Sequence, residues 1–167
     1  SGKSTIVNLI PRFFDVTEGA VYLDGRDVRE VTQSDLRDRI GYIPQRGVLF
    51  SGTVESNLRY ADENATAEDL QKAVEIAQAA DFIAEMDGGM AAPISQGGSN
   101  VSGGQKQRLS IARALMKHPP VYIFDDALSA LDFKTDAALR RALNRSTDRS
   151  TMLIVTQRGS TVRHAEQ

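Results

Sequence analysis

The sequence contains no cysteine, which excludes disulfide bonds and metal sites built from thiolates. It also lacks any apolar run close to the roughly 18 residues that a membrane-spanning helix requires. Basic residues are not in excess, since 20 Lys and Arg stand against 22 Asp and Glu, a formal net charge of −2. The chain therefore lacks a basic footprint for DNA or RNA, and we expect no nucleic-acid partner.

The 167 residues, 41% of them apolar, have the size and composition of one globular domain or of part of one. Two continuous apolar runs, residues 121–124 and 152–155, predict strands buried on both faces of a parallel sheet. Further strands are expected at 20–23 and 40–44, and Asp24-Gly25 is a hairpin turn signal. Helices are predicted over residues 3–13, 53–59, 66–80, 81–86, 103–117 and 132–144, with a short one around Leu36.

Strands and helices alternate near both ends of the chain, whereas the middle is mainly helical. This order predicts the α/β class, with residues 1–51 and 118–167 forming the core. Residues 52–117 are expected to form a helical subdomain carried by that core.

The first residues match the closing half of the phosphate-binding motif G-x-x-x-x-G-K-[ST], and the matching residues are Gly2, Lys3, Ser4 and Thr5. Backbone N–H groups at a helix start favour an anion, Lys3 supplies a positive charge, and the Ser4 hydroxyl is a natural Mg²⁺ ligand. The alternative is a helix start that merely reads this way. Because the other half of the motif would precede Ser1, we expect the chain to be an internal fragment.

Two polar residues directly follow predicted strands. Asp125 ends the apolar run 121–124, where a carboxylate can hold Mg²⁺ beside a nucleotide phosphate. Gln45 follows the run 42–44, and its amide oxygen could reach the same ion or its water. The alternatives are an ordinary carboxylate at a strand end and a solvated loop glutamine.

A glycine pair precedes the longest predicted helix. Ser102 and Gln105 have the spacing of a capping box, and Gly103 and Gly104 permit close approach of another backbone. A capped helix start flanked by glycine is also a phosphate site. The structural and the ligand-binding interpretations are compatible here.

These segments, in this order, resemble the nucleotide-binding domain of ATP-binding-cassette (ABC) transporters, and the resemblance covers essentially the whole chain. It rests on Ser1-Gly2-Lys3-Ser4-Thr5, on Val101-Ser102-Gly103-Gly104-Gln105 and on Phe124-Asp125-Asp126. It implies a P-loop NTPase fold with a RecA-like core and a helical subdomain, truncated at both ends. ATP and Mg²⁺ are the implied cofactors, with Ser4, Gln45 and Asp125 toward the metal.

The resemblance also implies partners. In this family Ser102 to Gln105 face the ATP held by a second nucleotide-binding domain, and Ser129 to Asp132 resemble the loop along that dimer interface. The context from Pro44 to Thr53 resembles the Q-loop of exporters, which contacts the membrane domain. ATP hydrolysis would then drive transport at the cytoplasmic face of the cell membrane, with a transmembrane domain expected on the same full-length chain.

The sequence departs from the family pattern at its own ATP site. Asp126 stands where Glu usually polarises the attacking water, and Gln157 stands where exporters usually carry His. A neutral amide can hydrogen-bond a phosphate but cannot carry a proton, and neither His118 nor His164 is placed to substitute. Gln96 replaces an acidic residue in a loop tied to coupling.

Because the signature residues are intact while Asp126 and Gln157 are altered, the chain resembles the degenerate-site half of a heterodimeric ABC exporter. Two alternatives remain. One is a fully competent ATPase of a homodimeric exporter, with Asp126 as the base. The other is a soluble ABC protein without transport, although residues 49–58 favour an exporter. We expect the isolated fragment to bind ATP poorly.

Overall fold

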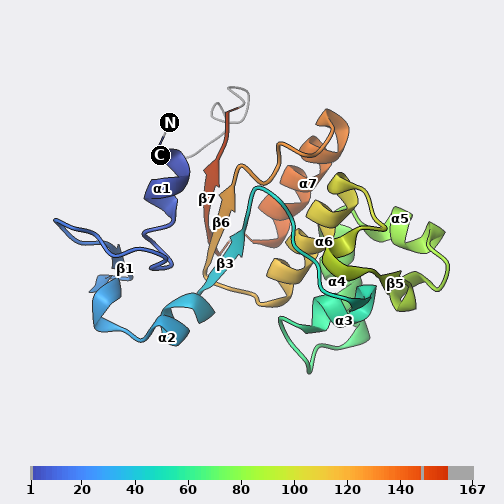
Figure 1. Cartoon of the computed structure of the whole chain (residues 1–167), viewed down its shortest axis with the longest axis horizontal. Helices are drawn as coiled ribbons and strands as arrows, with labels where there is room; N and C mark the ends of the chain where they lie inside the picture. Colours follow the sequence, from blue (N-terminus) through green and yellow to red (C-terminus); the bar gives the residue numbers. More distant parts are fainter. Residues whose placement is uncertain (1, 148, 158–167) are drawn as a thin grey trace.

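A computed structural model describes residues 2–147 and 149–157. Its centre is a parallel sheet of three strands in the order β3-β6-β7, formed by Ile40–Ile43, Val121–Asp125 and Thr151–Val155. Ile43 is paired with Phe124, and Asp125 with Val155. The predicted parallel sheet of apolar strands is therefore confirmed (Figure 1).

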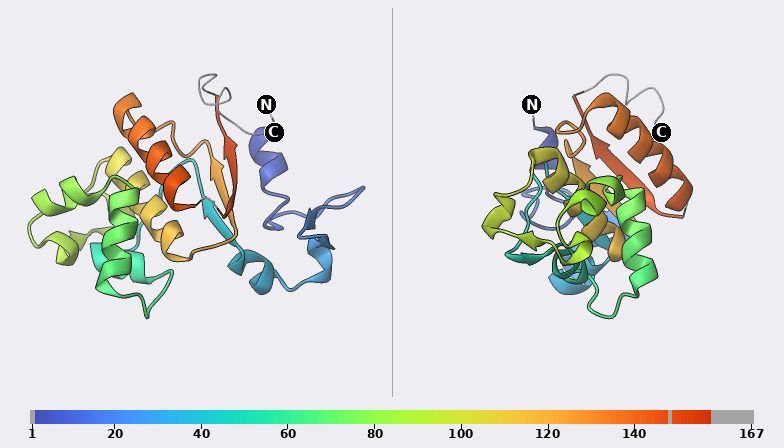
Figure 2. Two further views of the ribbon diagram at one scale, coloured as in Figure 1. Left: turned by 180° about the vertical axis from the view of Figure 1, so that it is seen from behind. Right: turned by 90° about the vertical axis from the view of Figure 1, so that its right-hand side faces the viewer.

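Helices cover both faces of this sheet (Figures 1 and 2). The helices are α1 Lys3–Val7, α2 Gln33–Asp38, α3 Val54–Arg59, α4 Ala67–Ile76, α5 Ala80–Glu85, α6 Gly103–Met116 and α7 Phe133–Ser146, with 3₁₀ turns η1 Val28–Glu30, η2 Gly89–Ala91 and η3 Gln96–Gly98. Two small antiparallel pairs complete the described fold, β1 Tyr22–Leu23 with β2 Arg26–Asp27, and β4 Gly52–Thr53 with β5 Pro93–Ile94. None of the described helices has the length and apolar character of a membrane span.

The first helix is much shorter than predicted, since α1 ends at Val7 rather than near residue 13. Beyond it the backbone tightens into turns, in which the N–H of Ile10 donates to Val7 and that of Phe13 to Asn8. Arg12 has a positive φ of 53°, which an α-helix does not accommodate. The expected helix length rested on apolar residues at helical spacing. That spacing continues through these turns, so it did not indicate where α1 ends.

The predicted helix 66–80 ends early, at Ile76, and the separately predicted helix 81–86 is confirmed as α5, Ala80–Glu85. The backbone of Gln78 has a positive φ of 58°, and its side-chain amide donates to the carbonyl of Glu75, which ends α4 and lets α5 begin at Ala80. The pair β4–β5 was missed because two-residue strands carry no periodicity. The hairpin at Asp24-Gly25, the helix around Leu36 and the start of α3 at Thr53 are confirmed.

Alternation along the strands sends the sheet's side chains into two apolar clusters. Ile43 and Phe124 face the larger cluster, which contains α3 to α7, whereas Ile40 and Ile123 face a smaller one with Val7 of α1. Figure 1 shows α1 and α2 on one side of the sheet and α3 to α7 on the other. In the described sheet β7 is an edge strand.

Helix α6 carries the centre of the larger cluster. Its Leu109 is 0% exposed, so Leu109→Ala removes buried methyl groups and leaves a cavity. We expect a loss of about 2–5 kcal/mol in the free energy of unfolding, measured by urea denaturation of the domain that contains this chain. Leu153→Ala on β7, where the side chain is 37% exposed, is the matched control and should cost clearly less. Equal losses would contradict this packing.

Candidate nucleotide site

The beginning of α1 meets the end of β6 at the carboxyl edge of the sheet. The Ser4 hydroxyl donates to Asp125 Oδ1 at 2.8 Å, although 121 residues separate the two in sequence. Gly2, in a left-handed conformation with φ 70°, precedes the helix, and its carbonyl accepts from the N–H of Ile6. The structure therefore brings the phosphate-loop residues Gly2 to Thr5 next to the strand-end carboxylate.

A residue that the sequence analysis did not single out completes the surroundings of Asp125. The Tyr42 hydroxyl on β3 donates to Asp125 Oδ2 at 3.1 Å and lies 2.9 Å from Asn8 Oδ1. Burial, together with the charge and hydrogen bond of Asp125, raises the pKa of Tyr42 to about 12. The phenol therefore keeps its proton at neutral pH, and Asp125 accepts a hydrogen bond on each oxygen.

Gln45 and Asp126 form a second pair at this edge. The Gln45 amide nitrogen donates to Asp126 Oδ2 at 3.1 Å, and the backbone N–H of Asp126 donates to Val155. Asp126 adopts a left-handed conformation with φ 51°. Since this contact uses the amide nitrogen of Gln45, its amide oxygen is the atom suited to a cation or to water.

The donors gathered here fit Mg²⁺. They are the hydroxyl of Ser4, the carboxylate of Asp125 and the amide of Gln45, all oxygen ligands of the kind that Mg²⁺ prefers. The described residues contain no cluster of three His, Cys, Asp or Glu that could hold a metal alone. A nucleotide site needs no such cluster, because substrate phosphates and water supply most Mg²⁺ ligands there.

The segment after β3 is fixed to α6. Its carbonyl oxygens at Pro44 and Val48 accept hydrogen bonds from Gln107 at 2.9 Å and Arg113 at 2.7 Å. A Cβ at Gly47 would lie 2.7 Å from a backbone oxygen of α6, so this close approach requires glycine. These contacts with α6 hold the segment that carries Gln45 in place, and they therefore support the contact between Gln45 and Asp126.

The glycine pair begins α6, and this helix lies on the far side of the sheet from α1 (Figures 1 and 2). Ser102 caps α6, since its Oγ accepts from the N–H of Gln105 at 3.2 Å and Gln105 Oε1 accepts from the N–H of Ser102 at 2.9 Å. Ser102 is exposed, and a Cβ at Gly103 would contact nothing within 4 Å. The predicted capping box is confirmed, and the helix that it caps is on the opposite side of the sheet from the helix that carries Ser4 (Figure 1).

The loop after Asp126 approaches the same helix start. A Cβ at Gly104 would lie 3.6 Å from the carbonyl oxygen of Ala130. Asp132 caps α7, accepting from the N–H and hydroxyl of Thr135, and these bonds lower the pKa of Asp132. The loop and the glycine pair therefore form one surface.

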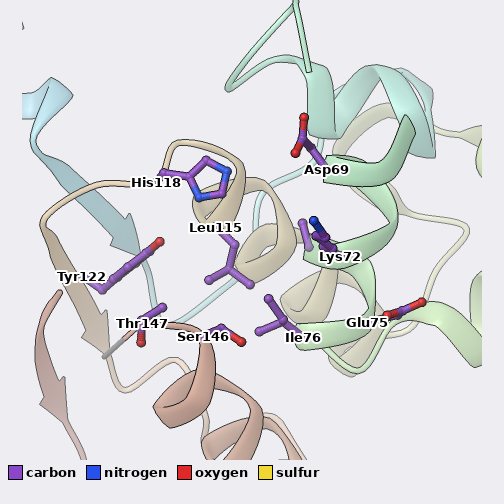
Figure 3. A pocket seen from close by; sticks show the side chains of 10 residues that line it. Asp69, Lys72, Glu75, Ile76, Leu115, His118, Tyr122, Ser146 and Thr147 are labelled. Carbon is purple, nitrogen blue, oxygen red and sulfur yellow. The ribbon is translucent and has the colours of Figure 1, made fainter. Parts of the chain in front are cut away.

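Gln157 is exposed just beyond the end of β7. Its neighbours from residue 158 onward, including the segment 160–163 and His164, lie outside the described residues. His118 precedes β6, at the opposite edge of the sheet from Asp125. There it lines a cavity of about 360 Å³ with Lys72 and Tyr122 (Figure 3).

Known proteins match this chain in sequence and in fold. The family model described as "ABC transporter" matches residues 1–129. An uncharacterized ABC transporter ATP-binding protein of Mycobacterium tuberculosis is 49% identical over 100% of this chain and 29% of its own length. An ATP-dependent lipid A-core flippase of Photorhabdus laumondii is 45% identical, again over 100% of this chain and 29% of its own.

Solved structures agree. A bacterial Atm1-family ABC exporter with ATP bound has a TM-score of 0.94 and 38% identity, covering 98% of this chain and 29% of that one. The chain thus spans under a third of the length of these relatives. It belongs to the ABC transporter family and has the P-loop NTPase fold of the nucleotide-binding domains of ABC exporters.

Proposed function

We propose that this chain is part of the ATP-binding and ATP-hydrolysing domain of an ABC exporter. The observation that carries the proposal is the hydrogen bond between Ser4 and Asp125, which joins the two ends of an oxygen-lined Mg²⁺ and phosphate site. Lys3 and the backbone N–H groups of Gly2 to Thr5 bind and orient the phosphates. Mg²⁺, when bound, neutralises charge that develops during phosphoryl transfer.

A second nucleotide-binding domain completes the site. At the start of α6, Ser102 and Gly103 are exposed and Gly104 is partly exposed, and α6 is on the opposite side of the sheet from α1 (Figure 1). We infer that they contact the phosphate of an ATP held by the partner domain, with residues 129–132 along the interface. The helix N-terminus supplies the N–H groups and the positive end of the dipole.

We further propose that the chain's own site is the slow one of a heterodimer. The Asp126 carboxylate is one methylene, roughly 1–1.5 Å, shorter than a glutamate, and it is bound by Gln45. Gln157 cannot carry a proton. The contact with Gln45 also supports the alternative of a competent homodimer, because it directs the Asp126 carboxylate into the nucleotide site.

The membrane domain is the second proposed partner. A cavity of about 420 Å³ lies between the turns that follow α1, the end of α2, β3 and α6, and it combines aromatic with cationic side chains, including Phe13, Tyr60, Arg37 and Arg113. Exporter relatives extend well beyond this chain, so we propose an intracellular helix of the transmembrane domain as the occupant. Under this proposal the domain would lie at the cytoplasmic face of the membrane.

The two apolar clusters also support the division of the domain into a core, residues 1–51 and 118–167, and a helical part, residues 52–117. The smaller cluster is built from residues of the proposed core. The larger one joins β3 and β6 to the helices of the proposed subdomain. Movement of the helical part would therefore act on the strands that carry the site.

Loss of the Lys3 charge tests the nucleotide site directly. In Lys3→Ala we expect photolabelling of this chain by 8-azido-ATP to fall about tenfold or more, measured on the full-length protein in lipid nanodiscs, since a charge-assisted phosphate contact is lost. Lys72→Ala, an exposed cation on α4, is the control and should label normally. Unchanged labelling of Lys3→Ala would contradict the proposal.

A further inference from the structure

Two polar side chains, those of Tyr42 and Asn8, form hydrogen bonds that lead to Asp125 Oδ2, the carboxylate oxygen that Ser4 does not contact. Tyr42 comes from the middle of β3, and Asn8 is the first residue after α1. The phenol oxygen lies 3.1 Å from Asp125 Oδ2 and 2.9 Å from the side-chain amide of Asn8. The side chains of Asn8, Tyr42 and Asp125 form a hydrogen-bonded series that runs from the end of α1 through β3 to β6.

The number of available protons fixes which group donates and which accepts in each hydrogen bond of this series. A phenol carries one proton, so it cannot donate to both Asp125 and an amide oxygen of Asn8. The carboxylate is the stronger acceptor because it is charged. We therefore assign the Asn8 amide with its NH₂ group toward the phenol oxygen, so that the amide donates and the phenol oxygen accepts. Each group then donates to the next, and the series ends on Asp125.

Burial and ring packing hold this hydrogen-bonded series in place. Asp125 is 7% exposed, and the ring of Phe13 packs edge-on against the ring of Tyr42 with their centroids 5.2 Å apart. Hydrogen bonds in such partly buried positions are stronger than in water. With Ser4 on Oδ1 and Tyr42 on Oδ2, the carboxylate has a single orientation.

We propose that Tyr42, supported by Asn8, is a positioning residue for the metal-binding carboxylate of Asp125. This rests on the proposed function, in which Asp125 lies toward Mg²⁺. The phenol holds Oδ2, so that Oδ1 stays directed at the Ser4 hydroxyl and at the cation site. Outer partners of this kind commonly change metal affinity by 10–100-fold when they are removed.

Tyr42→Phe removes the hydroxyl and keeps the ring that packs on Phe13. In the full-length protein, with the partner domain's nucleotide site disabled, Mn²⁺ binding in the presence of ATP is followed by electron paramagnetic resonance. We expect Mn²⁺ affinity to fall about tenfold or more, and ATP affinity in EDTA to stay within about twofold. Tyr122→Phe, on the neighbouring strand and in the cavity of Figure 3, is the matched control and should bind Mn²⁺ normally.

Asn8→Asp tests the direction of hydrogen-bond donation from Asn8 through Tyr42 to Asp125. A carboxylate at this position can accept a hydrogen bond from the phenol but cannot donate one, so it competes with Asp125 for the Tyr42 hydroxyl, and Mn²⁺ affinity should fall as it does in Tyr42→Phe. Wild-type affinity in either variant overturns the positioning role, while ATP-dependent Mn²⁺ binding by the wild type leaves the proposed function intact. Absence of any ATP-dependent Mn²⁺ site in the wild type overturns both.

Discussion

Replacing Ser102 by Arg lowers the steady-state ATP turnover of the full-length transporter by about 100-fold or more. Under the proposed arrangement Ser102 serves the ATP held by the partner domain, which is the faster site. Removing one donor aimed at charge in a transition state costs about 10²–10³-fold, and the bulk of arginine also obstructs closure of the dimer. Ser102 is exposed, so the domain has room to fold around the new side chain.

Comparing Ser102→Arg with Lys3→Ala distinguishes a slow and a fast site from two equivalent sites. If the chain's own site is slow, Lys3→Ala reduces turnover only a few-fold, although it removes ATP from that site. Ser146→Arg at the end of α7 is the control for added bulk and charge, since a cation is favourable at a helix C-terminus. Equal losses in Ser102→Arg and Lys3→Ala would mean that the two sites are equivalent.

The second large effect is a gain. In the double variant Asp126→Glu with Gln157→His we expect turnover at the chain's own site to rise about 100-fold. The added methylene moves the carboxylate toward the attacking water, and the imidazole supplies a group that can carry a proton. Turnover is measured as phosphate release, with the partner domain's site disabled so that this site alone is counted.

Single variants separate the two contributions. Gln157→His alone leaves the short carboxylate in place and should raise turnover much less than the pair does. Asp126→Asn removes the charge that accepts the hydrogen bond of Gln45, and should abolish the remaining activity. If the double variant is no faster than the wild type, Asp126 already acts as the base and the homodimeric alternative is supported.

Much of this fold could be predicted because its signals are local. The apolar strands, the capping box at Ser102 and the helix predicted from residue 132 each depend on residues within a few positions. The early end of α1 could not be predicted, because apolar spacing continues past Val7 while the backbone turns.

The site shows the same limit. Ser4, Gln45 and Asp125 could be named as candidates from their sequence contexts. Tyr42 could not be, because its contact with Asp125 depends on the register of β3 and β6. That register pairs Tyr42 with Ile123, which places the phenol on the face of the sheet that Asp125 shares two residues later. No pattern within either strand specifies this alignment.

The left-handed backbone of Asp126, with its φ of 51°, bears on which side chain is most stable at this position. Aspartate tolerates this conformation better than longer side chains do, because its short carboxylate can bond locally, and the left-handed form otherwise costs about 1–2 kcal/mol. The short side chain of Asp126 therefore relieves torsional strain at the bend after β6. If the proposed slow site is correct, the variant Asp126→Glu would gain turnover and give up some of this relief.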